Sequence, residues 1–357
     1  MTDNLGLCHH LTSQDSGPEN GEERRHPHQL RAQQLHRRRR VVVLAAVAAV
    51  VLVAGTAWYG LRELMALRVP DYSGTGQGNV VVRVEQGDTT TAIATRLASV
   101  DVVASARAFT RAAETHPRIR SVQPGYYQMR TRMSGAAAVT MLLDPASRVG
   151  QLDIRAGTQI DDVRQPDGTL TPGILSLLSR ASCVRIDGTR SCVSAEQLRE
   201  AMRQTPPAEL GVPAWAVEPL ARVDPGRRLE GLIMPGRYDV RPGSPPVDLL
   251  TQVMSTSTAR LQGAGMPEIA ASTGFAPYQV LIIASIIEKE AIASDFGAVS
   301  RVIYNRLAEQ MPLQMDSTIN YPLDRQHITT TDADRARPGP YNTYLTPGLP
   351  ASPIGTP

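Results

Sequence analysis

The segment Leu281–Ser294, LIIASIIEKEAIAS, combines long aliphatic side chains with two glutamates and predicts a helix. Residues three and four positions apart share a helix face, so Ile283, Ile286 and Ile287 form an apolar stripe. Glu290 lies on the same stripe, whereas Glu288 projects from roughly the opposite side. Because a carboxyl group on an apolar stripe loses hydration, we expect the pKa of Glu290 to be raised.

A glutamate that stays protonated near neutral pH can donate a proton to a leaving oxygen. Glu290 is therefore the candidate general acid of this chain. The alternative is that Glu290 pairs with an arginine distant in the sequence and only supports the fold. The helix alone does not decide between these two interpretations.

The composition is that of an ordinary globular protein. Of the 357 residues, 42% are hydrophobic and 20% are charged, and the length suffices for two or three domains. The net charge of +3 argues against a nucleic-acid partner. No cluster has metal-ligand spacing and no glycine-rich phosphate loop occurs, so we expect neither a metal nor a cofactor. Lys289, the single lysine, is expected to be a solvated neighbour of Glu290.

An uncharged segment near the N-terminus, VVVLAAVAAVVLVAGTAWY over Val41–Tyr59, is long enough to span a bilayer. Four arginines precede it directly, which predicts a cytoplasmic N-terminus and an extracytoplasmic remainder. We therefore predict a disordered cytoplasmic tail over residues 1–40, a single cell-membrane helix over 41–61 and a linker over 62–79. A cleaved signal peptide is the alternative.

Two cysteines lie in the predicted extracytoplasmic region. Cys183 and Cys192 bracket VRIDGTRS, in which Asp187-Gly188 is typical of a hairpin turn. Such a hairpin would bring the two cysteines together, and an oxidising compartment would permit a disulfide. Two free buried thiols are the alternative.

The rest of the chain alternates strand and helix patterns, which predicts a mixed α+β fold. After the linker we expect a strand, two helices, a return strand and a further helix, forming a module over residues 80–150. A second α+β domain is expected over residues 151–357. Within it the patterns predict a strand–turn–strand over Arg228–Val240 and helices over Pro246–Leu261, from Pro277, and over Phe296–Gln310.

Three ordered segments carry a resemblance to a known family: Ala284–Glu290, Val302–Leu307 continuing to Pro312–Tyr321, and Tyr341–Gly355. Together they closely resemble the YceG-like family of membrane-anchored endolytic murein transglycosylases. The stretches YPLDRQ and TTTDADR are similar to the actinobacterial form, and Arg228–Tyr238 also matches. The resemblance covers most of the chain from residue 41. It implies a LysM-like module over 80–150 and a catalytic domain over 151–357.

Members of this family cleave peptidoglycan strands between N-acetylmuramic acid and N-acetylglucosamine. By resemblance, Glu290 matches the catalytic glutamate and first protonates the glycosidic oxygen. After the bond breaks, its carboxylate takes the proton of the sugar's own C6 hydroxyl, which closes a 1,6-anhydro ring without water. A second catalytic carboxylate is unnecessary, unlike in most glycoside hydrolases. The resemblance further implies peptidoglycan polymerases as partners.

Other polar residues of the matched segments are candidates for holding sugar rings, because hydroxyl and amide groups suit sugar hydroxyls and acetamides. These candidate substrate-binding residues are Asn305, Gln314, Asp316, Thr318, Tyr341, Asn342 and Tyr344. Structural alternatives exist: Asn305 could brace its helix, Tyr344 could belong to the core, and Asp316 could hold its loop. If Asp316 instead positioned a water molecule, the enzyme would be a hydrolase.

The chain departs from the family pattern in two places. It reads GLPASPIG where relatives read GLPPGPI, with Ala351 and Ser352 at the difference. It also stops at Pro357, where relatives continue with strands and a helix, so we expect a catalytic domain truncated at its C-terminal end. A non-catalytic, membrane-anchored peptidoglycan-binding scaffold is therefore the alternative function. The LysM-like module could contact glycan or act as a spacer.

Overall fold

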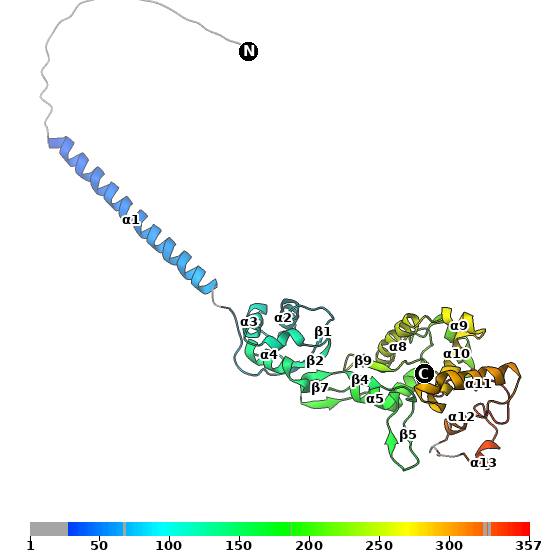
Figure 1. The fold of residues 1–357 in the computed structure, drawn as a ribbon. Helices are drawn as coiled ribbons and strands as arrows, with labels where there is room; N and C mark the ends of the chain where they lie inside the picture. Colours follow the sequence, from blue (N-terminus) through cyan, green and yellow to red (C-terminus); the bar gives the residue numbers. More distant parts are fainter. Residues whose placement is uncertain (1–27, 67–68, 187, 324–326, 328–329) are drawn as a thin grey trace, which may run out of the picture. The chain divides into compact units, whose positions relative to one another are not determined.

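The computed structural model describes residues 28–66, 69–186, 188–323, 327 and 330–357 (Figure 1). The chain divides into two units, residues 1–68 and Val69–Pro357. The first unit contains helix α1 (His28–Ala66), in which Val41–Gly60 is long and apolar enough to cross a membrane. The transmembrane helix predicted over 41–61 therefore falls within α1.

Helix α1 begins before the predicted membrane segment. Residues His28–Arg40, which we predicted as part of a disordered tail, are helical. Arginine, glutamine, leucine and alanine are good helix formers, and a helix that is already nucleated adds residues at little cost. The remainder of the predicted tail, residues 1–27, lies outside the described residues.

The second unit starts with the module predicted over residues 80–150. Its elements are β1 (Asn79–Val84), α2 (Thr90–Ser99), α3 (Ala106–Ala113), a 3-10 helix (Pro117–Ser121), β2 (Gly125–Arg130), α4 (Gly135–Leu143), a second 3-10 helix (Pro145–Ser147) and β3 (Arg148–Val149). Strand β1 pairs antiparallel with β2, which places Val82 opposite Tyr127, and β2 pairs with β3. The observed order of strand, two helices, strand and helix agrees with the prediction.

This module has a hydrophobic core of its own. The core runs from Val82 to Leu142, and a second, larger core runs from Leu152 to Ile354. The boundary that we predicted at residue 150 lies between the two. Each of the α-helices α2, α3 and α4 follows a residue whose side chain accepts a backbone N–H, such as Thr89 before α2.

The larger core is built mainly from helices, and the described strands in this part of the chain form three two-stranded sheets. Its elements are β4 (Gln151–Ile154), β5 (Val163–Arg164), β6 (Leu170–Thr171), α5 (Ile174–Ala181), β7 (Val184–Ile186), β8 (Thr189–Ser191), α6 (Ala195–Gln204), α7 (Ala214–Val217), a 3-10 helix (Pro219–Arg222), β9 (Gly236–Asp239), α8 (Pro246–Gly263), α9 (Glu268–Thr273), α10 (Pro277–Glu290), a 3-10 helix (Ala293–Asp295), α11 (Phe296–Ala308), α12 (Asp316–Asn320) and α13 (Asp332–Arg335). The helices predicted from Pro246, Pro277 and Phe296 begin at those residues.

The strand–turn–strand predicted over Arg228–Val240 is half wrong. Only β9 forms, and its antiparallel partner is β4, with Leu152 opposite Tyr238. The residues before β9 form turns instead, and their side chains Leu229, Leu232 and Ile233 are buried. The sequence pattern identified the apolar residues, but it did not indicate that the strand pairing with β9 is β4, which lies far away in the sequence.

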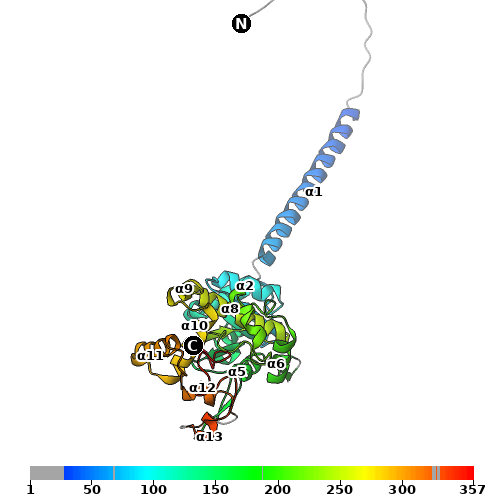
Figure 2. The same cartoon turned by 90° about the vertical axis from the view of Figure 1, so that its right-hand side faces the viewer.

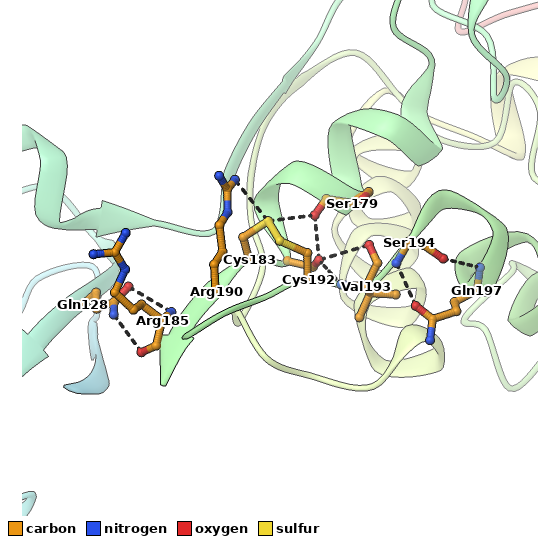
Figure 3. The surroundings of a disulfide bond; sticks show 10 residues. Gln128, Ser179, Cys183, Arg185, Arg190, Cys192, Val193, Ser194 and Gln197 are labelled. Atoms are coloured by element: carbon orange, nitrogen blue, oxygen red, sulfur yellow. Dashed lines mark hydrogen bonds between the residues drawn. A yellow bond between two sulfur atoms is a disulfide. The ribbon is translucent and has the colours of Figure 1, made fainter. Parts of the chain in front are cut away.

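Strands β7 and β8 form the hairpin that the sequence predicted around Gly188, whose φ of 80° suits glycine. Asp187, the other predicted turn residue, lies outside the described residues. Cys183 and Cys192 flank this hairpin and are joined by a disulfide (Figure 3). The cysteine pair that the sequence singled out is thus bonded in the structure.

Helices α11 and α12 lie beside α10 (Figures 1 and 2). Ile283 and Ile286 on α10 and Ile303 on α11 are buried in the shared core. The apolar stripe of α10 therefore faces inward, as predicted, and its C-terminal end approaches the start of α12.

Candidate active site

Glu290 is the last residue of α10, and its side chain is exposed to solvent. The expectation that the apolar stripe shields this carboxyl group is wrong. The stripe is buried at Ile286, but Ile287 is only partly buried, and Glu290 is exposed even though its carboxylate contacts Ser317. Helix periodicity places a residue on a face, but burial also requires neighbouring segments that cover that face, and at Glu290 they leave the carboxyl group accessible.

The Glu290 carboxylate contacts the first turn of α12. Its Oε1 accepts a hydrogen bond of 2.9 Å from the backbone N–H of Ser317. The Ser317 hydroxyl beside this bond is buried without a hydrogen-bond partner among the described residues. The end of α10 thus contacts the start of α12 through the accessible Glu290 carboxylate, beside a Ser317 hydroxyl that can still form hydrogen bonds.

Asp316, the neighbour of Ser317, is held by three side chains. Its Oδ1 accepts hydrogen bonds of 2.6 Å from both the Thr330 and the Tyr344 hydroxyls, and Oδ2 lies 3.5 Å from Arg335 Nη2. Partial burial raises the pKa of Asp316, but the two hydroxyl donors and the arginine charge outweigh it, so the pKa is lowered. Asp316 is therefore a fixed carboxylate that accepts hydrogen bonds.

Tyr344 is the second member of this group. Burial and its hydrogen bond to Asp316 raise the pKa of the Tyr344 hydroxyl, which remains a donor. The Arg335 guanidinium lies over the Tyr344 ring, 5.0 Å from its centroid. Tyr344 is only partly buried and is therefore not a core residue. Tyr344 and Asp316 belong to the same group of bonded side chains, and both are partly accessible to solvent.

Two of the candidate sugar-binding residues have structural roles instead. Thr318 is fully buried, and its hydroxyl bonds Met315 O at 2.7 Å and the Thr343 hydroxyl at 2.8 Å. Asn342 is 8% exposed, and its amide makes four hydrogen bonds, to the backbone of Arg335, Arg337, Tyr344 and Leu345. These bonds use the full capacity of the amide, so the prediction that Thr318 and Asn342 bind sugar is wrong for this structure.

The remaining candidates differ in accessibility. Gln314 is exposed with φ of 52°, and its backbone N–H bonds Thr343 O at 2.9 Å, so its side chain is free to face a ligand. Asn305 is exposed on α11, and no described side-chain bond ties it to its helix. Tyr341 is partly buried, with its ring 4.7 Å from that of Tyr321 and its hydroxyl 2.8 Å from that of Ser352.

The sequence did not single out Glu230, which is the most deeply buried acid among the described residues. Glu230 is 1% exposed, and its carboxyl accepts bonds from the Ile160 N–H at 3.1 Å and the Tyr321 hydroxyl at 3.0 Å. Burial raises the pKa of Glu230 from 4.5 to about 7, against the lowering effect of these two donors. Its location among Leu229, Leu232 and Ile233 was the sequence signal for this burial.

The surroundings of Glu230 are also charged. Arg227 and Lys289 act on its carboxyl electrostatically, and burial lowers the pKa of Lys289. Lys289 is partly buried, so the expectation of a solvated lysine beside Glu290 is wrong. Because Glu230 has almost no accessible surface, it cannot touch a substrate in this structure, whereas the exposed Glu290 can. Within the described residues no three His, Cys, Asp or Glu side chains gather to hold a metal ion.

The chain is thus a mixed α+β protein with an apolar N-terminal helix and an exposed glutamate beside a bonded Asp–Tyr–Arg group. The model of the YceG-like family matches residues 82–357, and the chain belongs to that family. This confirms the resemblance found in the sequence motifs.

Two named relatives are similar to this chain. An endolytic murein transglycosylase of Bacillus subtilis (strain 168) is 30% identical over 127 residues, which are 35% of each chain. An endolytic murein transglycosylase of Streptococcus pneumoniae serotype 2 is 25% identical over 292 residues, 78% of this chain and 50% of that one. The chain thus spans at most half the length of these relatives. A crystal structure of a YceG-like protein from Listeria monocytogenes aligns with a TM-score of 0.48 at 21% identity, covering 78% of this chain and 86% of that one.

Proposed function

We propose that this protein is an endolytic murein transglycosylase that cleaves the bond between N-acetylmuramic acid and N-acetylglucosamine in nascent peptidoglycan. The proposal rests on one observation: the glutamate that matches the family motif is accessible and adjoins a group of polar side chains suited to sugar. The names of the relatives support the same general activity.

In the proposed reaction, Glu290 in its acid form gives its proton to the glycosidic oxygen as the bond to C1 breaks. The C6 hydroxyl of the same muramic acid then attacks C1, and the Glu290 carboxylate takes the hydroxyl proton. The 1,6-anhydro product forms without water, and Glu290 returns to its starting form. Because Glu290 is exposed in the free chain, the bound glycan itself has to displace water from the carboxyl group.

The residues beside Glu290 have distinct parts in this proposal. The Ser317 N–H orients the carboxylate through its 2.9 Å bond. Asp316 and Tyr344, fixed against each other, present oxygen atoms to sugar hydroxyls and acetamides, and the exposed amides of Gln314 and Asn305 bind further along the strand. Tyr341 supplies an aromatic face at the edge of this group.

We further propose that α1 anchors the chain in the cell membrane with its N-terminus in the cytoplasm and the second unit outside. The Cys183–Cys192 disulfide supports this orientation, because such bonds persist in oxidising compartments. At this location the enzyme would act on new strands beside peptidoglycan polymerases. The LysM-like module then either contacts the strand or sets the distance of Glu290 from the membrane.

The test is digestion of purified sacculi with the full chain in detergent, with the products identified by mass spectrometry. We expect 1,6-anhydro ends in the wild type and their loss in Glu290→Gln. The matched control is Glu288→Gln on the same helix, which we expect to keep cleavage. Ends heavier by one water would instead show a hydrolase in which Asp316 or another group positions water.

A non-catalytic, membrane-anchored scaffold is the second candidate, because Glu290 is exposed to solvent in the structure and not shielded as the sequence predicted. The two functions separate in one comparison. If neither the wild type nor Glu290→Gln releases fragments while both bind sacculi equally, the scaffold is the correct interpretation and the catalytic proposal fails.

A further inference from the structure

A basic hollow lies away from Glu290, where the LysM-like module meets the disulfide-bonded hairpin. Its volume is about 1030 Å³, and β2, β3 and the β7–β8 hairpin contribute to its lining. Five arginines line it against a single acidic side chain, Asp144: they are Arg130, Arg148, Arg180, Arg185 and Arg190. A volume of this size exceeds what one small ion needs and is in the range of sites for larger ligands.

Most of these arginines have no acidic partner within the described part of the chain. Arg148 is paired with Asp239 at 3.3 Å, whereas Arg130, Arg180, Arg185 and Arg190 take part in none of the ion pairs found among the described residues. All four are exposed. Elsewhere in this unit arginines commonly meet carboxylates, as Arg199 does with Asp161. The hollow therefore collects unneutralised positive charge.

The hairpin that carries two of these arginines is held in place (Figure 3). The disulfide Cys183–Cys192 closes its base, and the Gln128 amide on β2 bonds the backbone of Arg185, donating to its O at 2.9 Å and accepting from its N at 3.4 Å. The Arg190 guanidinium also lies 3.4 Å from Cys183 Sγ. Both walls of the hollow are thus fixed before any ligand arrives.

Arg185 and Arg190 are directly opposite each other in the β7–β8 ladder. Like charges at such a position are destabilising, and Asp144 is the one acidic side chain among the described lining residues. An anion bound between the two guanidinium groups would remove this repulsion and gain charge-assisted, bidentate hydrogen bonds. The amides of Gln77, Asn79 and Gln128 on the same lining suit the peptide groups of such a ligand.

We propose that this hollow binds the carboxylate-bearing stem peptides of the peptidoglycan strand, as a site separate from the Glu290 group. The inference rests on the proposed function for the identity of the strand. It assigns to the hairpin the recognition of peptide-substituted glycan over bare glycan. A strand held there would be retained by charge while another part of it reaches the sugar-binding residues.

The test measures equilibrium binding of soluble glycan strands to the full chain in detergent, in a Glu290→Gln background that prevents cleavage. Three probes are compared: strands with free stem-peptide carboxylates, the same strands with those carboxylates amidated, and strands without peptides. We expect the first probe to bind about tenfold more tightly than the other two. The Arg185→Gln/Arg190→Gln double variant should lose that difference. The control double variant Arg107→Gln/Arg111→Gln removes two exposed α3 arginines outside the hollow and should retain it.

The proposal is overturned if amidated and free strands bind equally to the unmodified hollow, or if the Arg185/Arg190 double variant keeps the difference. Inorganic polyphosphate serves as a fourth probe: if it binds through Arg185 and Arg190 while the peptide-bearing strand does not, the hollow is a phosphate site and the proposal fails. Trp215 fluorescence during urea unfolding verifies that each variant is folded. Because every readout is binding, failure here is distinct from failure of Glu290→Gln to abolish cleavage.

Discussion

Replacing the buried Glu230 with glutamine should change how the stability of the chain depends on pH. In the folded chain the pKa of Glu230 is about 7, because burial disfavours its charged form, against 4.5 in solvent. Between these two values the unfolded chain has released the proton while the folded chain retains it. The free energy of unfolding must therefore fall as the pH rises through this window.

The magnitude follows from the size of the pKa difference. A difference of roughly 2.5 units corresponds to about 3 kcal/mol at about 1.4 kcal/mol per unit. Below pH 4.5 both states hold the proton and there is no loss; above about pH 7 the loss is complete. Glutamine does not titrate, and its amide oxygen can still accept from the Ile160 N–H and the Tyr321 hydroxyl.

The assay is urea unfolding of the full chain in detergent between pH 4.5 and 8, monitored by Trp215 fluorescence in a Trp58→Phe background. We expect Glu230→Gln to be less stable than, or similar to, its parent at pH 4.5 and to gain about 3 kcal/mol relative to it by pH 7.5. Glu218→Gln, at an exposed carboxyl paired with Arg222, is the control that should follow the parent profile. A pH-independent difference between Glu230→Gln and its parent would refute the reasoning.

Further expectations concern the neighbouring residues and the hairpin. Thr318→Val removes a buried hydroxyl bonded to two groups and should cost about 1–3 kcal/mol in urea unfolding while glycan binding persists. Tyr344→Phe removes one donor to Asp316; stability should fall by about 1–2 kcal/mol at pH 7, and the loss should shrink when acid protonates Asp316, as measured by unfolding at both pH values. The Cys183→Ser/Cys192→Ser variant opens a loop with a separation of 9 residues and should lower the unfolding free energy by about 2.5 kcal/mol, an effect that dithiothreitol should reproduce in the wild type.

Local signals in the sequence predicted the helices around the site well. Pro277 at the first turn and the repeat of Ile283, Ile286 and Ile287 define α10, and both features act within one turn of the chain. The hairpin around Gly188 is similarly local, since turn chemistry and short strands are adjacent. Pairing between strands far apart in the sequence was not predictable in the same way. We predicted β9 as one strand of a local strand–turn–strand, but its partner is β4.

The candidate sugar-binding residues show the same limit. Residue type indicates which groups can bond a sugar hydroxyl, but not whether those groups are already used. Asn342 and Thr318 have suitable chemistry, but both are buried, and their polar groups already bond neighbouring backbone and hydroxyl groups. Asp316 and Tyr344 bond each other and are still partly accessible to solvent. Their accessibility depends on how α12 and the C-terminal segment fold against each other, which the residue types alone do not indicate.

The structure buries a different glutamate from the one that the helix pattern predicted to be shielded. Desolvation raises the pKa of Glu230, which is buried in the core, whereas Glu290 lies exposed at the end of α10. A catalytic acid that must meet a long polymer cannot be sealed in advance, because the polymer needs a path to it. If Glu290 is the acid, the bound strand must exclude water from the carboxyl group by covering it. Short glycan fragments that leave Glu290 exposed to water should therefore be cleaved slowly even when they bind.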